Sequence, residues 1–218
     1  MNFTEWQENA RHRRMPRVSF GAAARRKTFR LLAALALLAS PVLALAALMH
    51  GFSLAASLEI RNRNLPAADH NAIKHAYAAA EVYSWLRPLM GAQTAARVVI
   101  RLGETNEWAE RYVKPQVDWS PETYKDLHNN LAGIEASEWL YAQAGFTSPF
   151  TRLRLIGRLA EDKDLAASHE DPRIPPLPMR TDDGTAIRKM QEDEATLRAG
   201  LAAALAAKTP ALRADLGL

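Results

Sequence analysis

The side chains best suited to chemistry fall in three short clusters within one stretch of the chain. These clusters are Asp69–Ala76, Gly103–Glu107 and Asp126–Gly133. Histidine, present in the first and third clusters, can act near neutral pH as a metal ligand or as an acid–base group, and carboxylates can complete either role. Because the chain has no cysteine, a set of His, Asp and Glu side chains would suit zinc, manganese or iron.

Helical geometry narrows the candidates in the first cluster. His70 and His75 are five residues apart, which is about 140° around a helix, so they cannot hold one metal from a regular helix. His75 lies one turn after Asn71 and shares its face. We therefore take His75 as the candidate site residue of the first cluster.

The third cluster should lie in the first half of a helix. Ser120-Pro121 is a strong helix start, and nothing breaks the helix before Gly145. Inside a helix, each Asn or Gly lowers the helix stability by roughly 0.5–1 kcal/mol relative to Ala, so their repeated occurrence in this cluster needs an explanation. At about 100° per residue, one helical face would carry Asp126, Asn129, Asn130 and Gly133.

Two reasons for this polar face remain open. One is a contact between helices, with Gly133 allowing close approach, and the other is a functional site. We predict different roles for the individual residues. Asp126 and His75 should face a cavity, and Asn130 should hold the Asp126 carboxylate by a hydrogen bond. The residues predicted to give structural support are Asn71, Asn129, Asn130 and Gly133.

The order of these motifs resembles a bacterial domain family of unknown function that occurs in exported and cell-wall-associated proteins. That family carries Arg-His-Ala, His-Glu and Asp-x-x-Asn-Asn-x-x-Gly motifs. Here Lys74-His75-Ala76 has Lys in place of Arg, Asn106-Glu107 stands where His-Glu is expected, and Asp126–Gly133 matches throughout. The resemblance covers about residues 69–134. It implies an exported protein and a role for Glu107, and it supplies no reaction. We therefore take His75, Glu107 and Asp126 as candidate catalytic residues and as candidate ligands of a divalent metal.

The basic character of the chain belongs to its first 30 residues rather than to its body. Residues 1–30 hold eight Lys and Arg against Glu5 and Glu8, a net charge of +6. The whole chain carries +4, so removing +6 leaves −2 for residues 31–218. We therefore predict no nucleic-acid partner, because the positive charge stops where an apolar run begins.

That apolar run predicts a single membrane span. Leu31 to Met49 is nineteen residues without a charge, close to the roughly 20 needed to cross a bilayer core. The basic leader before it orients the N-terminus to the cytoplasm, at a bacterial inner membrane with the body in the periplasm. A retained anchor is favoured over a signal cleaved after Ala46, because the run exceeds the usual apolar region of about 7–15 residues.

Downstream of the span, we predict an all-α body. Helical periodicity interrupted by Gly and Pro recurs, and strand alternation is absent beyond a few residues. The expected helices cover residues 66–87, 92–102, 104–113, 121–144, 150–160 and 185–207. The expected parts are a leader (1–30), the span (31–49), a juxtamembrane linker (50–64), a compact helical domain (65–165), a Pro-rich linker (166–184) and a C-terminal helix with its tail (185–218).

Two functions of different classes follow from the sequence. One is a membrane-anchored periplasmic hydrolase acting on envelope material, lipid or peptidoglycan, through His75, Glu107 and Asp126. The other is a non-enzymatic envelope scaffold or binding protein, in which Asp126, Asn129 and Asn130 clamp neighbouring helix backbones. In either case the C-terminal helix, set beyond the Pro-rich linker, could contact a protein partner weakly.

Overall fold

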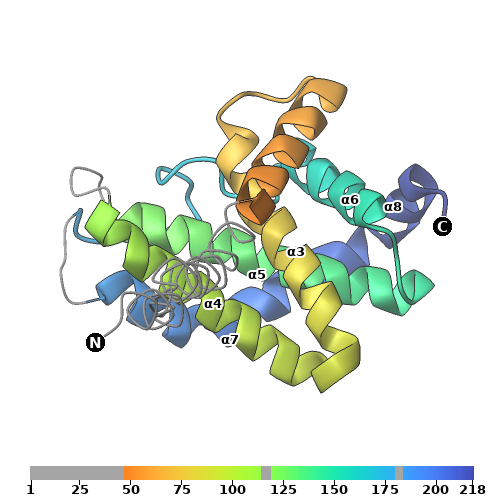
Figure 1. The fold of residues 1–218 in the computed structure, drawn as a ribbon. Helices are drawn as coiled ribbons and strands as arrows, with labels where there is room; N and C mark the ends of the chain where they lie inside the picture. The colour runs from red at the N-terminus through yellow and green to blue at the C-terminus, as the bar shows by residue number, and fades with distance from the viewer. Residues whose placement is uncertain (1–46, 114–118, 180–183) are drawn as a thin grey trace, which may run out of the picture. The chain divides into compact units, whose positions relative to one another are not determined.

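The computed structural model describes residues 47–113, 119–179 and 184–218, and in these ranges it contains helices and no strand. The prediction of an all-α body is confirmed. Residues 47–63 form a helix. It is followed (Figure 1) by α3 (Asp69–Met90), α4 (Ala92–Val113), α5 (Trp119–Ala144), α6 (Pro149–Glu161), α7 (Thr185–Ala207) and α8 (Thr209–Leu216).

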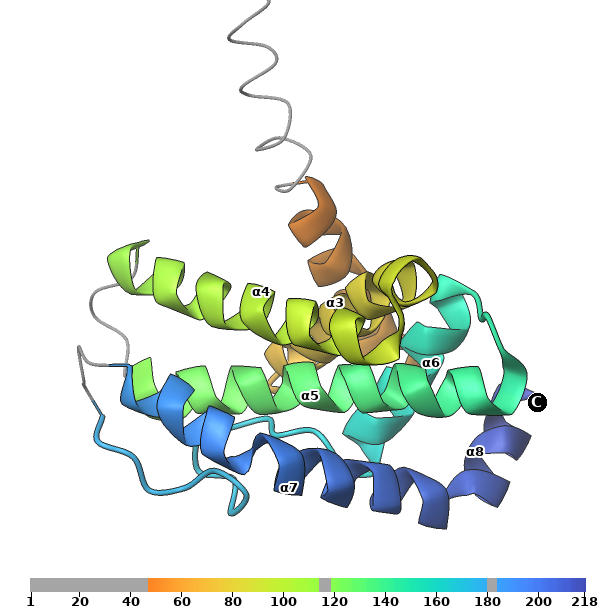
Figure 2. The same ribbon diagram turned by 90° about the horizontal axis from the view of Figure 1, so that it is seen from below.

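The α5 helix lies at the centre of this arrangement. It contacts α3, α4, α6 and α7, with α3 and α4 on one side and α7 on the opposite side (Figure 2). Every residue from Ser120 to Leu140 is buried except Glu122 and Glu138, which are half-buried. Because α5 has no solvent-facing side over this length, each of its polar groups needs a partner in the protein.

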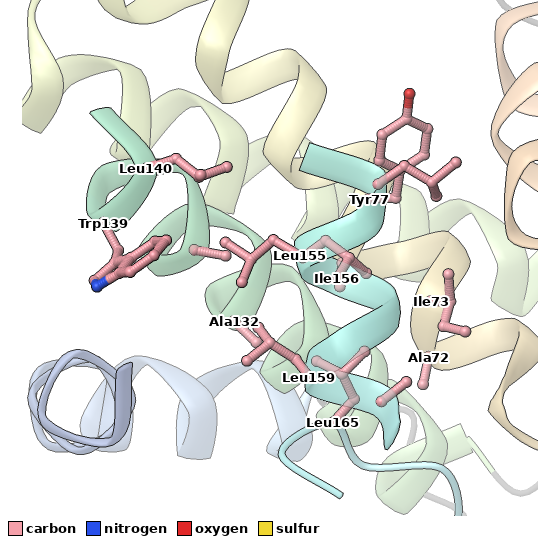
Figure 3. Packing of buried hydrophobic residues seen from close by; sticks show 14 of the residues in the cluster. Ala72, Ile73, Tyr77, Ala132, Trp139, Leu140, Leu155, Ile156, Leu159 and Leu165 are labelled. Atoms are coloured by element: carbon pink, nitrogen blue, oxygen red, sulfur yellow. The ribbon is translucent and has the colours of Figure 1, made fainter. Parts of the chain in front are cut away.

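Apolar packing against α5 forms two clusters. The first joins α3, α5, α6 and α8, with Ile73, Leu140 and Ile156 each fully buried (Figure 3). The second joins α3, α4, α5 and α7 through Tyr83, Leu131 and other buried side chains. Together they hold α3 and α7 on opposite sides of the same central helix.

The segment after α6 differs from the predicted Pro-rich linker. Ala166 and Ile174 are buried in the second apolar cluster, and Arg173 donates hydrogen bonds to the backbone oxygen atoms of Asp164 and Leu165. The α7 helix packs along α5 rather than standing apart, and residues 48–218 form one compact unit. Ile174, which lies between two of the prolines, is buried in the core, so this segment does not serve as a spacer.

Two further boundaries differ from the sequence prediction. Residues 50–64, predicted as a linker, are helical to residue 63, and Phe52 and Ala56 are buried there. The α4 helix runs through Gly103, where we expected a break. Gly103 sits against α5, since a Cβ atom there would lie 2.6 Å from Asn130 Nδ2.

The predicted span, Leu31 to Met49, lies outside the described residues except for its last three. Within the described ranges, no helix combines the length and the apolar character needed to cross a membrane.

Gly133 sets how closely α3 and α5 approach. A Cβ atom at this position would lie 2.0 Å from the backbone oxygen of Ala76 and 2.8 Å from its carbonyl carbon. Both contacts are to backbone, which a side-chain rotation cannot relieve. Since Ala76 follows His75 in the chain, this close approach also places His75 beside α5.

Replacing Gly133 should therefore separate the two helices. We expect Gly133→Ala to lower the free energy of unfolding by about 3 kcal/mol through overpacking. At Gly200 on α7, a Cβ atom would have no neighbouring atom within 4 Å, so Gly200→Ala should instead stabilise the protein by roughly 0.5–1 kcal/mol. Denaturant unfolding of both variants checks this; a tolerant Gly133→Ala would contradict the close approach.

Candidate metal centre

Three buried side chains from three helices meet at one point. His75 on α3, Glu107 on α4 and Asp126 on α5 each place one potential ligand atom within 4.8 Å of the other two. His75 Nε2 lies 3.4 Å from Asp126 Oδ2. The three candidate site residues predicted from the sequence are thus brought together by the fold.

Amide side chains from the same helices orient the two carboxylates. Asn71 Nδ2 donates to Asp126 Oδ1 over 2.9 Å, and Asn106 Nδ2 donates to Glu107 Oε1 over 3.3 Å. The bond from Asn71 occupies Oδ1 of Asp126, while Oδ2 of the same carboxylate faces His75. Such outer hydrogen bonds fix ligand orientation in metal sites.

The prediction that Asn130 holds the Asp126 carboxylate is wrong. The amide that bonds to Asp126 belongs to Asn71, on α3. Asn130 instead packs against Gly103 of α4 and lines a cavity of about 10 Å³ between α4, α5 and α7. Asn130 follows Asp126 by one turn of α5, but its side chain points to the neighbouring helix α4.

The other members of the motif are structural. Asn129 Nδ2 donates to the backbone oxygen of Ala166, and the backbone N–H of Ala166 donates to Asn129 Oδ1, each over 2.9 Å. Gly133 admits the backbone of α3. Asp126 therefore lies in the cluster, while Asn129 and Gly133 make the contacts between segments that the structural interpretation predicts.

Burial governs the electrostatics of Asp126. Burial, together with the Glu122 carboxylate, raises the pKa of this carboxyl, and the net value is about 6. The ammonium groups of Lys125 and Lys74 and the hydrogen bond from Asn71 act in the opposite direction. A buried carboxyl that titrates near neutral pH is typical of functional sites, although structural networks also produce it.

Lys125 adds a buried positive charge that the sequence analysis did not single out. Its Nζ lies 3.6 Å from Asp126 Oδ1 and pairs with Glu122, which also receives His169 Nδ1 at 2.9 Å. Burial lowers the pKa of Lys125, but the Asp126 and Glu122 carboxylates outweigh it and raise that pKa above its usual value. Only folding brings His169 to this place, so no sequence spacing could have indicated it.

The two other histidines of the sequence motifs do not join the cluster. His70 Nε2 lies 3.1 Å from Ser57 Oγ and from the backbone oxygen of Ser53. His128 is buried, and its Nδ1 has no hydrogen-bond partner among the residues that the structure describes. Burial, aided by the Arg173 charge, lowers the pKa of His128 to about 4.

The donor set fits a divalent cation. One imidazole nitrogen and two carboxylate oxygens suit zinc, manganese or iron, and three protein ligands leave coordination positions open. A cation with bonds of about 2.1 Å reaches donors up to about 4.2 Å apart, so small side-chain rotations would close this set on an ion. Compared with protein-family models, curated proteins and solved structures, the chain matches none.

The contrast between the two adjacent asparagines is testable. Asn129→Ala removes both bonds to Ala166 and leaves a buried backbone N–H and C=O unpaired, which should cost about 3 kcal/mol of unfolding free energy. Asn130→Ala should cost about 1 kcal/mol or less, because Ala also improves helix propensity. Chemical denaturation measures both, and a larger loss in Asn130→Ala would contradict the assignment.

His128 should make the protein sensitive to acid. Its pKa is about 4 when folded, against an ordinary value of 6.5, so unfolding takes up a proton between these values. The stability that this histidine contributes is present above pH 6.5 and is lost as the pH falls towards 4, by about 3 kcal/mol in total. His128→Leu should remove this loss.

The raised pKa of Asp126 changes the free energy of unfolding with pH in the opposite direction. Its contribution favours the folded state below pH 4 and is lost as the pH rises through 6. Denaturant unfolding at pH 7 and pH 5 in metal-free buffer should therefore compare His128→Leu with the matched variant Asp126→Asn. If His128→Leu keeps the full acid loss, the effect belongs to another group.

Proposed function

We propose that this protein binds one divalent cation at His75, Glu107 and Asp126 and uses it for hydrolysis, while tethered to the bacterial inner membrane with its body exported. The observation that carries the proposal is the convergence of three buried ligand atoms, from three helices, within 4.8 Å of one another. The exported location rests on the basic leader and the apolar run of residues 31–49, and on the family resemblance over residues 69–134.

The charge of the cluster supports a cation. Glu107 and Asp126 are two buried carboxyl groups in close proximity, and buried charges in proteins are paired or coordinate metals. Lys125 contributes one positive charge near Asp126, but it also faces Glu122. A divalent ion would take both carboxylates as ligands, while His75 would bind as the neutral imidazole.

The open coordination positions support hydrolysis in particular. With three protein ligands, a bound Zn²⁺ keeps a water molecule and lowers its pKa to about 7, which makes it a nucleophile at neutral pH. The residues here would hold the ion, and Lys125 would place a positive charge nearby. A body that faces the periplasm would meet lipid or peptidoglycan, so envelope material is the proposed substrate class.

The alternative is an envelope scaffold, and one observation favours it. The polar groups of α5 mainly join helices: Ser137 donates to the backbone oxygen of Ala80 on α3, and Glu135 pairs with Arg198 on α7. In that case, the His75 cluster would be one more of these contacts and would not bind metal.

Metal binding separates the two functions. After removal of metals, Zn²⁺ or Mn²⁺ titrated into the full-length protein should bind at one ion per chain by calorimetry. Asp126→Asn and Glu107→Gln should each weaken the affinity by at least about tenfold, since each removes a charged ligand. Bound metal should also raise the melting temperature of the wild type.

Glu104→Gln is the matched control. Glu104 is buried on the same helix as Glu107, but it bonds to Arg101 and Gln191 instead of joining the cluster. Its replacement should leave the affinity unchanged. Equal losses in both glutamate variants, or no binding by the wild type, would favour the scaffold.

A further inference from the structure

A cavity lined by both apolar and polar side chains lies away from the His75 cluster. It has a volume of about 110 Å³ and lies between the second half of α3, the second half of α5 and the segment that leads into α6. Tyr83 is eight residues beyond His75, about 12 Å along α3. An apolar cavity of about 150 Å³ accepts benzene, so this one has room for a small head group.

The Tyr83 hydroxyl points to a ligand. Tyr83 lines the cavity and is 1 % exposed, and its hydroxyl oxygen is buried without a hydrogen-bond partner in the described part of the chain. Buried phenol groups normally find a partner. An unpaired hydroxyl on a residue that lines a cavity is a candidate donor to a bound molecule.

The charged groups around the cavity are already balanced. Arg152 donates from Nε and Nη2 to the two Glu81 oxygens over 2.7 and 2.8 Å. Arg87 donates from Nε and Nη2 to Glu138 over 3.0 and 3.5 Å, and its guanidinium lies 3.3 Å from the centre of the Tyr141 ring. The Nη1 group of Arg87 takes part in neither of its two hydrogen bonds to Glu138, so it is a second group that can donate to a ligand.

The remaining lining is amphipathic. Ser137 Oγ donates to the backbone oxygen of Ala80, and Ser84 Oγ donates to Ser137 Oγ over 3.4 Å, so these hydroxyls are engaged with each other. Phe146, which also lines the cavity, is 71 % exposed. A ligand could therefore place a polar head inside and an apolar tail against this ring.

We propose that this cavity binds the carbonyl or carboxylate head of a short acyl compound. The Tyr83 hydroxyl and Arg87 donate to the oxygen of the head, and the tail lies over Phe146. The chemistry common to both heads is an sp² oxygen acceptor. This site is independent of the metal centre, since the two share no residue.

Ligand-observed NMR on the full-length protein tests this with butyrate, butyramide and n-butanol at constant ionic strength. Saturable binding of butyrate or butyramide supports the site. Tighter binding of butyrate identifies a carboxylate head, and equal binding of the two identifies a neutral carbonyl. Equal binding of butanol, or no saturable binding by any of the three, overturns the proposal and leaves a cavity for water alone.

Tyr83→Phe removes the hydroxyl and keeps the ring. It should weaken binding about tenfold, the size of one hydrogen bond. The melting temperature should not fall, because the hydroxyl has no partner to lose. Tyr124→Phe is the matched control: its hydroxyl donates to Asp193 over 2.7 Å, so it should lower stability and leave binding intact. Ser84→Val, which narrows the cavity, should also abolish binding. Unchanged binding in both cavity variants would overturn the site.

Discussion

The burial of α5 is the constraint on which the rest of the structure depends. A helix enclosed along most of its length must find partners for its polar side chains inside the protein. Several of them bond to different neighbours: Asn129 to the segment after α6, Tyr124 to Asp193 on α7, and Trp139 to Thr209 on α8. Thr123 Oγ1 and His128 Nδ1 have no hydrogen-bond partner among the described residues. The polar groups of α5 therefore determine where the surrounding elements lie.

Asp126 differs from these pairs because it meets several groups at once. Asn71 and His75 approach it from α3, Glu107 from α4 and Lys125 from its own helix. A second carboxyl in the same buried place adds repulsion that a structural contact would avoid. This convergence of one imidazole and two carboxyl groups is the observation behind the proposed cation site.

Much of the site could be predicted because its signals are local. Residue types and helical spacing indicated His75 and Asp126, and the motif resemblance indicated Glu107. Ser148-Pro149 marked the start of α6, where Ser148 caps the helix. The errors came from contacts between distant segments. Asn71 replaced Asn130 as the partner of Asp126, and Ala166 and Ile174 entered the core, because tertiary packing decides which face each side chain meets.

X-ray absorption at the metal edge of the zinc-loaded, full-length protein tests the central claim most directly. The three proposed ligands predict one imidazole nitrogen and otherwise only oxygen around the ion, at about 2.0–2.2 Å. The imidazole signal should disappear in His75→Asn. Two or more imidazoles, or a spectrum unchanged by that substitution, would contradict the account.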